Sequence, residues 1–183
     1  MKLKDLLRLF NVNDLRLLPE AVLPVVLSNS QERDILYREL IELNGFDMSY
    51  DWFQSIYEED LSDRKHKKQD FTPRQVADIC SCLTESTDGS THEPTAGTGS
   101  LLISNWWRKA LAHIPFDFYP SRNPIECWEI SDRSIPILLL NLSIRGIVGI
   151  VHHGDVLEKK EQHCYRLVNP MDDCLGFSKV YAL

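Results

Sequence analysis

The feature that most constrains the fold is a regular alternation of strand-like and helix-like segments after residue 70. Short extended stretches alternate with stretches of ten or more residues whose apolar positions recur at helical spacing. The expected strands are residues 90–93, 125–130, 148–152 and 164–168, and the expected helices are residues 72–83, 100–113 and 133–145. The helix at 72–83 is expected to open with Thr72 as its N-cap and to carry Val76, Ile79 and Leu83 on one face. This order is typical of β-α-β units and predicts an α/β fold with an open, mainly parallel sheet.

The first 69 residues predict an N-terminal helical bundle instead. Residues 29–45 carry the clearest pattern, with Asn29 as the expected N-cap, Glu32 three residues later and Gly45 as the stop signal. Shorter helices are expected at residues 3–10 and 51–61.

Two prolines and one hydrophilic run divide this N-terminal half. Pro19 and Pro24 are expected to break the segment between the helices into short pieces, because proline cannot donate a main-chain hydrogen bond. The hydrophilic residues 62–70 are the best linker candidate. The chain is therefore expected to divide into two domains, residues 1–69 and residues 70–183.

Composition excludes several classes of protein. The 183 residues are 43% hydrophobic and 26% charged, which is close to the globular average and argues against a disordered or membrane protein. The net charge of -7 argues against nucleic-acid binding through bulk electrostatics, and the only concentrated basic run, residues 64–68, is more typical of a solvated loop than of a phosphate-binding segment. The absence of a secretory apolar segment predicts a cytoplasmic protein.

The cysteines predict free thiols and no metal site. The five cysteines include no C-x-x-C pair, so disulfides and a structural zinc site are both less expected than buried thiols. No residue is therefore expected to bind a metal ion.

The small-residue stretch "HEPTAGTGSLLI", residues 92–103, predicts a turn against which a ligand can lie. Gly97 and Gly99 carry no Cβ and can adopt positive φ. A P-loop would require Lys after the last glycine, and a dinucleotide fingerprint would require a third glycine where Leu102 stands. An ordinary tight turn and the binding of an adenosine-sulfonium cofactor, which carries no phosphate, both remain open at this point.

Four spaced segments resemble the ordered motifs of adenine-specific DNA methyltransferases, especially the modification subunits of type I restriction systems. The segments are "QDFTPRQVADI" (69–79), "EPTAGTGSLLI" (93–103), "CWEISDRSIPILLLNLSIRGI" (127–147) and "HHGDVLE" (152–158). The resemblance implies a Rossmann-like S-adenosylmethionine-dependent methyltransferase fold with an incomplete sheet, and S-adenosylmethionine as cofactor.

The resemblance also implies a set of site residues. Glu129 corresponds to the acid that binds the ribose hydroxyls, and Asp155 to the acid that faces the adenine amine. For Glu129 a solvated strand end, and for Asp155 a simple turn role, remain as alternatives. The implied cofactor-binding residues are Phe71, Thr72, Pro73, Glu93, Pro94, Ala96, Gly97, Gly99, Glu129, Ile130, Asp155 and Val156.

The catalytic motif of the family is only partly present. The family sequence is Asn/Asp-Pro-Pro-Tyr/Phe, and this chain has Asn169 and Pro170 followed by Met171 and Asp172. Loss of the aromatic residue removes about 1–3 kcal/mol of base stacking. Asn169 and Pro170 are the implied catalytic residues, and an ordinary Asn-Pro turn is nearly as well supported.

These observations predict a family member that binds S-adenosylmethionine and, if active, methylates adenine in DNA. The chain ends thirteen residues after Pro170, so we expect a partner subunit to supply DNA recognition and the rest of the sheet. The alternative is a catalytically inactive cofactor-binding subunit, a decoy or a mobile-element remnant. Methylation of a small molecule or a protein is a third, less supported reading.

Overall fold

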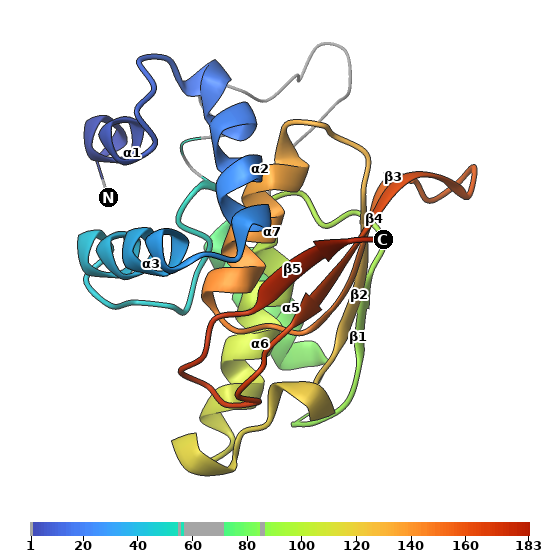
Figure 1. Ribbon diagram of the computed structural model, residues 1–183. Coiled ribbons are helices and arrows are strands. Elements are labelled where there is room, and N and C mark those ends of the chain that lie inside the picture. The colour runs from blue at the N-terminus through green and yellow to red at the C-terminus, as the bar shows by residue number, and fades with distance from the viewer. Residues whose placement is uncertain (1, 55, 57–71, 85–86) are drawn as a thin grey trace.

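The computed structural model describes residues 2–54, 56, 72–84 and 87–183, which form a five-stranded sheet with helices on one of its faces (Figure 1). The strands are β1 (Thr91–Glu93), β2 (Ile125–Glu129), β3 (Gly149–Asp155), β4 (Lys160–Val168) and β5 (Lys179–Ala182). The α-helices are α1 (Leu3–Leu9), α2 (Leu18–Ser28), α3 (Gln31–Leu43), α5 (Arg74–Leu83), α6 (Ser100–Leu111) and α7 (Ser134–Ile144). The α/β class expected from the sequence is therefore confirmed.

The strands follow one another across the sheet in chain order, β1-β2-β3-β4-β5. The first three strands are parallel and are connected through α6 and α7, whereas β4 runs antiparallel to both β3 and β5. Residues 156–159 are too few for the crossover that a parallel partner of β3 would need, so β3 and β4 form a hairpin. In the described residues β4 alone runs against the other four strands, so the sheet is mixed, although most of its strands share one direction as expected.

The two faces of the sheet have different surroundings. Cys127, Val151 and Tyr165 are buried on the helix-covered face. Their strand neighbours Glu126 and Arg166 point to the opposite face and are exposed. In the described part of the chain, the helices lie on the first face alone (Figure 1).

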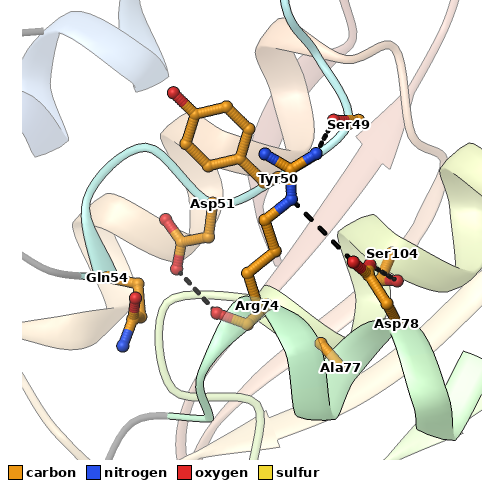
Figure 2. Close-up of a pocket in the computed structure, with 9 residues that line it drawn as sticks. Ser49, Tyr50, Asp51, Gln54, Arg74, Ala77, Asp78 and Ser104 are labelled. Carbon is orange, nitrogen blue, oxygen red and sulfur yellow. Dashed lines mark hydrogen bonds and ion pairs between the residues drawn. The ribbon is translucent and has the colours of Figure 1, made fainter.

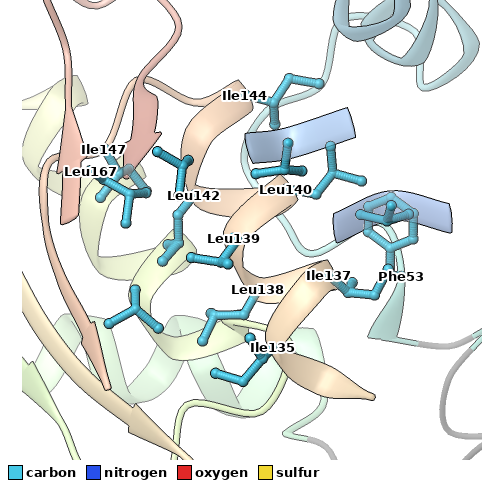
Figure 3. Close-up of a cluster of buried hydrophobic side chains, with 14 of the residues drawn as sticks. Phe53, Ile135, Ile137, Leu138, Leu139, Leu140, Leu142, Ile144, Ile147 and Leu167 are labelled. Atoms are coloured by element: carbon cyan, nitrogen blue, oxygen red, sulfur yellow. The ribbon is translucent and has the colours of Figure 1, made fainter. Parts of the chain in front are cut away.

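The core is organised around α7. Every residue of this helix is buried, and α2 packs along it on the side away from the sheet (Figure 3). Leu138, Leu142 and Ile144 belong to one hydrophobic cluster that extends from Leu6 to Val180. A helix that is apolar all round is typical of a central, fully enclosed position.

Two expectations about the N-terminal helices are wrong. Pro24 lies inside α2 and does not break it. Pro24 is exposed, so the carbonyl that it leaves without a helical partner can bind water, while Val22 and Val26 hold the helix against the core. Asn29 is the left-handed C-cap of α2, and the N-cap of α3 is Ser30, whose hydroxyl accepts the N–H of Arg33.

Helix α5 also differs from expectation. Its N-cap is Pro73, not Thr72, and no side chain caps it. Val76, Ile79 and Leu83 form an apolar stripe as expected, but this stripe is exposed, and the helix packs on α6 through Ala77 and Ser81. The small residues allow the two helices to approach closely.

Several expected segments lie outside the described residues. They are most of the helix expected at 51–61, the linker 62–70 with its basic run 64–68, the domain boundary at 69–70, and Phe71. None of the helices in the described ranges is both long and apolar enough to cross a membrane.

Candidate functional site

The glycine-rich turn joins the carboxyl end of β1 to the start of α6. Gly97 and Gly99 have φ values of 57° and 103°, in the left-handed region that glycine adopts without strain. The N–H of Ala96 donates to the carbonyl of Trp128 at 2.8 Å, and the N–H of Gly99 donates to the carbonyl of Ala96 at 2.9 Å. The turn is therefore fixed by main-chain bonds to β2 and within itself.

Gly99 lies against the core. A Cβ at this position would come within 3.0 Å of the Leu138 side chain of α7. The absence of a side chain thus allows α6 to begin directly over α7, which places the first amides of α6 next to the strand ends.

Glu129 links the end of β2 to the glycine turn. Glu129 is 6% exposed. One of its carboxylate oxygens accepts the N–H of Gly97 at 2.7 Å, and the other accepts the N–H of Ser131 at 2.7 Å. Hydrogen bonds from main-chain N–H groups favour the charged form of a carboxylate. This carboxylate lies beside a turn, residues 93–99, that contains no Lys or Arg.

The other predicted residues of this edge are placed as follows. Glu93 ends β1, and its carboxylate accepts the N–H of Thr95 at 3.2 Å, while Pro94 is exposed. Ile130 follows Glu129 and is 47% exposed. Because β1, β2 and β3 are parallel, Glu93, Glu129 and Asp155 all lie at the same edge of the sheet.

Asp155 has a local role in the hairpin. Its carboxylate accepts the N–H groups of Leu157 at 2.8 Å and Glu158 at 3.2 Å, and Val156 lies between these residues in the turn. Asp155 thus performs the turn-forming function that the sequence left as the alternative to a contact with adenine.

A buried carboxylate that the sequence did not indicate, Asp51, holds the glycine turn through hydrogen bonds. Asp51 is 7% exposed, and its oxygens accept the hydroxyls of Thr98 at 2.5 Å and Ser100 at 3.1 Å. Asp51 also accepts the side-chain amide of Asn141 of α7 at 2.8 Å, and that amide donates in addition to the carbonyl of Thr98. The preceding segment, the turn and α7 therefore share one polar network.

Arg145 extends this network. Its guanidinium donates to the carbonyls of Met48 and Tyr50 at 3.0 and 2.6 Å and lies 4.5 Å from the centre of the Trp52 ring. Burial lowers the pKa of Arg145 to about 10, so the side chain remains charged at neutral pH. No pattern in the sequence indicated this contact, because its members are almost a hundred residues apart.

The N-termini of α5 and α6 meet at a small pocket (Figure 2). Its lining includes Asp51, Arg74 and Ser100, and its volume of about 30 Å³ accommodates water-sized groups. A wider groove of about 290 Å³ continues from it between α5 and α6, past Asp78 and Ser104. The structure thus brings the helix that follows Thr72 and Pro73 next to the helix that follows the glycine turn.

Asn169 and Pro170 lie at the other end of the sheet. Because β4 is antiparallel, its last residues pair with the beginning of β3, so Asn169 is about 15–20 Å of strand away from Glu129. The Asn169 amide donates to the carbonyls of Gly146, Asp173 and Gly176, and its oxygen accepts two main-chain N–H groups of the following turn. The structure does not bring these two residues together with the cofactor candidates, and their catalytic role stays a prediction.

His153 is a second residue near the strand ends that the sequence analysis missed. It pairs with Glu129 across β2 and β3, and its ring stacks on that of His163 with centroids 5.6 Å apart. Burial lowers the pKa of His153, the nearby His163 lowers it further, and the carboxylate of Asp132, 3.1 Å from Nε2, opposes this shift. The double His in "HHGD" was the available signal.

The fold is an α/β domain in which the glycine turn and Glu129 lie at the carboxyl ends of parallel strands, and comparison with known families identifies it. The model of the N-6 DNA methylase family matches residues 48–174, and the chain belongs to this family. The match begins before Asp51, so the segment that supports the glycine turn lies within the family domain. No curated protein matches the chain.

Proposed function

We propose that this chain binds S-adenosylmethionine at the edge formed by the glycine turn and Glu129, and that it serves adenine methylation in DNA. The observation that carries the proposal is the carboxylate of Glu129, held by two main-chain N–H groups beside a turn without basic residues. A carboxylate can accept two ribose hydroxyls, and glycines without a Cβ let a ligand approach the main chain.

The charge of the site fits the same ligand. A nucleotide cofactor carries phosphates, which the carboxylate would repel, whereas the adenosine-sulfonium cofactor carries a positive charge. When bound, S-adenosylmethionine supplies an activated methyl group. The residues of this chain would hold the ribose at Glu129 and support the turn through Asp51.

Calorimetry with S-adenosylmethionine and its demethylated product tests the binding proposal. We expect saturable binding by the full chain and at least a tenfold loss of affinity in Glu129→Ala. Glu39→Ala, an exposed carboxylate on α3, is the matched control and should bind like the wild type. Absence of binding at millimolar ligand, or equal affinity in the two variants, contradicts the proposal.

Transfer is tested separately from binding. Label from methyl-labelled S-adenosylmethionine should appear on adenine N6 when the chain is incubated with DNA and a partner subunit that supplies DNA recognition but has no methyltransferase activity of its own. DNA substrates in which single adenines are replaced would then define the target, because the label is lost when the target adenine is absent. If label never reaches adenine although the cofactor binds, the methyl-transfer half of the proposal is wrong.

One observation favours a second candidate, a cofactor-binding subunit that does not itself catalyse. Both ends of the Asn169 amide are occupied by the turn that follows β4, at the edge of the sheet opposite Glu129. Binding without transfer in the two experiments above is the result that this candidate predicts.

A further inference from the structure

The face of the sheet that carries no helix in the described residues holds a cluster of three different metal-ligand types. His152 of β3 and Cys164 of β4 are direct cross-strand partners, and Glu161 lies near them. One nitrogen, one oxygen and one sulfur atom from these residues lie within 4.8 Å of one another. The cluster lies on the side of the sheet away from Cys127 and the core.

A β-bulge brings Glu161 into the cluster. Residues three apart on a regular strand point to opposite faces, so Glu161 and Cys164 would be separated by the sheet. The pairing shifts between His153 and Gly154, where His153 pairs with His163 but Gly154 pairs with Glu161. The extra residue turns Glu161 to the face of Cys164, and bulges are a known means of redirecting a side chain.

One pair of atoms already has a separation suited to a small ion, and a small movement of the Glu161 side chain, which contacts the ring directly, would admit the ion. His152 Nδ1 and Cys164 Sγ are 3.8 Å apart. An ion with tetrahedral geometry and ordinary zinc bond lengths would hold these atoms about 3.6 Å apart. Nδ1 of the same ring also contacts a carboxylate oxygen of Glu161. Three donors around a shared centre leave a fourth tetrahedral position for water.

The surroundings orient the histidine ring for this role. Nε2, the ring nitrogen that faces away from the cluster, lies 3.5 Å from a carboxylate oxygen of Glu126. Trp128 stacks on the ring with a centroid distance of 4.4 Å and an interplanar angle of 17°. A carboxylate behind a histidine is the usual outer partner of a metal-binding ring, because it fixes which nitrogen carries the proton.

We propose that His152, Glu161 and Cys164 form a binding site for a zinc ion. The mixture of imidazole, carboxylate and thiolate donors suits zinc among the common divalent ions, since calcium and magnesium select oxygen ligands. On binding, Cys164 loses its thiol proton to solvent, and the thiolate, the imidazole nitrogen and the carboxylate oxygen bind the ion without any redox change.

No sequence motif such as a C-x-x-C pair marks these three residues, because they come from two strands and are brought together by a bulge. Burial, and then the charge of Glu161, raise the pKa of the Cys164 thiol. The ion must therefore displace a proton from a neutral thiol. The site is independent of the proposed cofactor site, since His152 and His153 point to opposite faces of β3.

The test is titration of the metal-free full chain with Zn²⁺ by calorimetry and with Co²⁺ by absorption. We expect one equivalent of Zn²⁺ and a thiolate-to-cobalt charge-transfer band. Cys164→Ser should remove the band and weaken zinc binding at least 100-fold. Cys174→Ser, which changes a thiol remote from the cluster, should keep both, as should Cys80→Ser combined with Cys82→Ser.

Glu126→Gln tests the carboxylate behind His152, and it should not disturb the packing because this side chain is exposed. Outer carboxylate partners are typically worth 10–100-fold in metal affinity, and we expect a loss in that range. Glu158→Gln, an exposed residue of the hairpin turn, should bind zinc like the wild type. Failure of the wild type to bind zinc at millimolar concentration, or unchanged affinity in both Cys164→Ser and Glu126→Gln, overturns the proposal.

Discussion

The carboxylate of Glu129 accepts the main-chain N–H of Gly97 at 2.7 Å and so joins the end of β2 to the turn that leaves β1. The second oxygen is bound to the N–H of Ser131, within the loop that leads to α7. One side chain thus sets the positions of two loops at the edge where the ligand is proposed to bind.

Glu129→Gln is expected to destabilise the fold as well as weaken cofactor binding. The amide can accept only one of the two N–H groups and directs its own NH₂ at the other, so we expect a loss of about 1.5–3 kcal/mol in the free energy of unfolding. Urea denaturation measures it, with Glu39→Gln as the control. A change below about 0.5 kcal/mol would show that the two bonds contribute little to stability.

Gly99→Ala separates backbone strain from packing. Gly99 and Gly89 have nearly equal φ values, 103° and 105°, but a Cβ at Gly89 meets nothing within 4 Å, while one at Gly99 meets Leu138. We expect Gly89→Ala to cost about 1–2 kcal/mol through φ alone. Gly99→Ala should cost about 1–3 kcal/mol more, through overpacking against α7. Thermal or urea unfolding of both variants gives the difference, and equal losses would contradict it.

Asp51→Asn should weaken the network below the glycine turn. The substitution removes the negative charge near the buried guanidinium of Arg145 and replaces one acceptor by a donor that faces Thr98, Ser100 or Asn141. We expect a loss of about 3 kcal/mol in the free energy of unfolding. Asp117→Asn, an exposed position, is the control for the same chemical change. Wild-type stability in Asp51→Asn would mean that the network is not required by the fold.

His153 predicts a pH dependence of stability. Burial lowers its pKa in the folded state below the ordinary value, so the unfolded chain binds the proton more readily. The contribution of this residue is therefore fully present above about pH 6.5 and is lost as the pH falls through that value and below it. Chemical denaturation between pH 7.5 and 5 should show a smaller loss of stability in His153→Gln than in the wild type. His92→Gln, on the exposed face of β1, should follow the wild type.

The α/β class and the glycine turn could be predicted from the sequence because both depend on local patterns. The alternation of strands and helices located β1, β2, β3, α6 and α7 to within a few residues. Gly97 and Gly99 adopt the positive φ values that their residue type suggested. These are properties of short segments, which one sequence is sufficient to reveal.

Strand direction and buried polar contacts could not be predicted in the same way. A strand near Cys164 was expected, but its antiparallel direction was not, because the short turn at residues 156–159 was not recognised. Val76, Ile79 and Leu83 lie on one face of α5 as expected, but nothing in the sequence indicated that this face is exposed. The structure buries Ala77 and Ser81 instead, because Ser104 of α6 forms hydrogen bonds with Asp78 and Ser81.

The candidate site divides along the same line. Glu129 and the glycine turn are side by side as a local reading suggested, whereas Asp51 and Arg145 form contacts across 90 residues or more. No local sequence pattern indicates contacts between residues so far apart. The Asn-Pro pair was found by its motif, and its position relative to Glu129 depended on the direction of β4.

The pairing of Asn29 with β5 bears on the order in which the molecule assembles. The Asn29 side chain bonds to both the N–H and the carbonyl of Val180 at 2.9 Å, 151 residues away, whereas each strand of the sheet pairs with the strand before it in the chain. The sheet can therefore form as the chain is synthesised, but α2 cannot complete its packing until β5 is present. Hydrogen exchange in Asn29→Ala would reveal this as faster exchange confined to α2 and β5. Helix α2 thus gains its last contacts only after almost all of the described chain has been made.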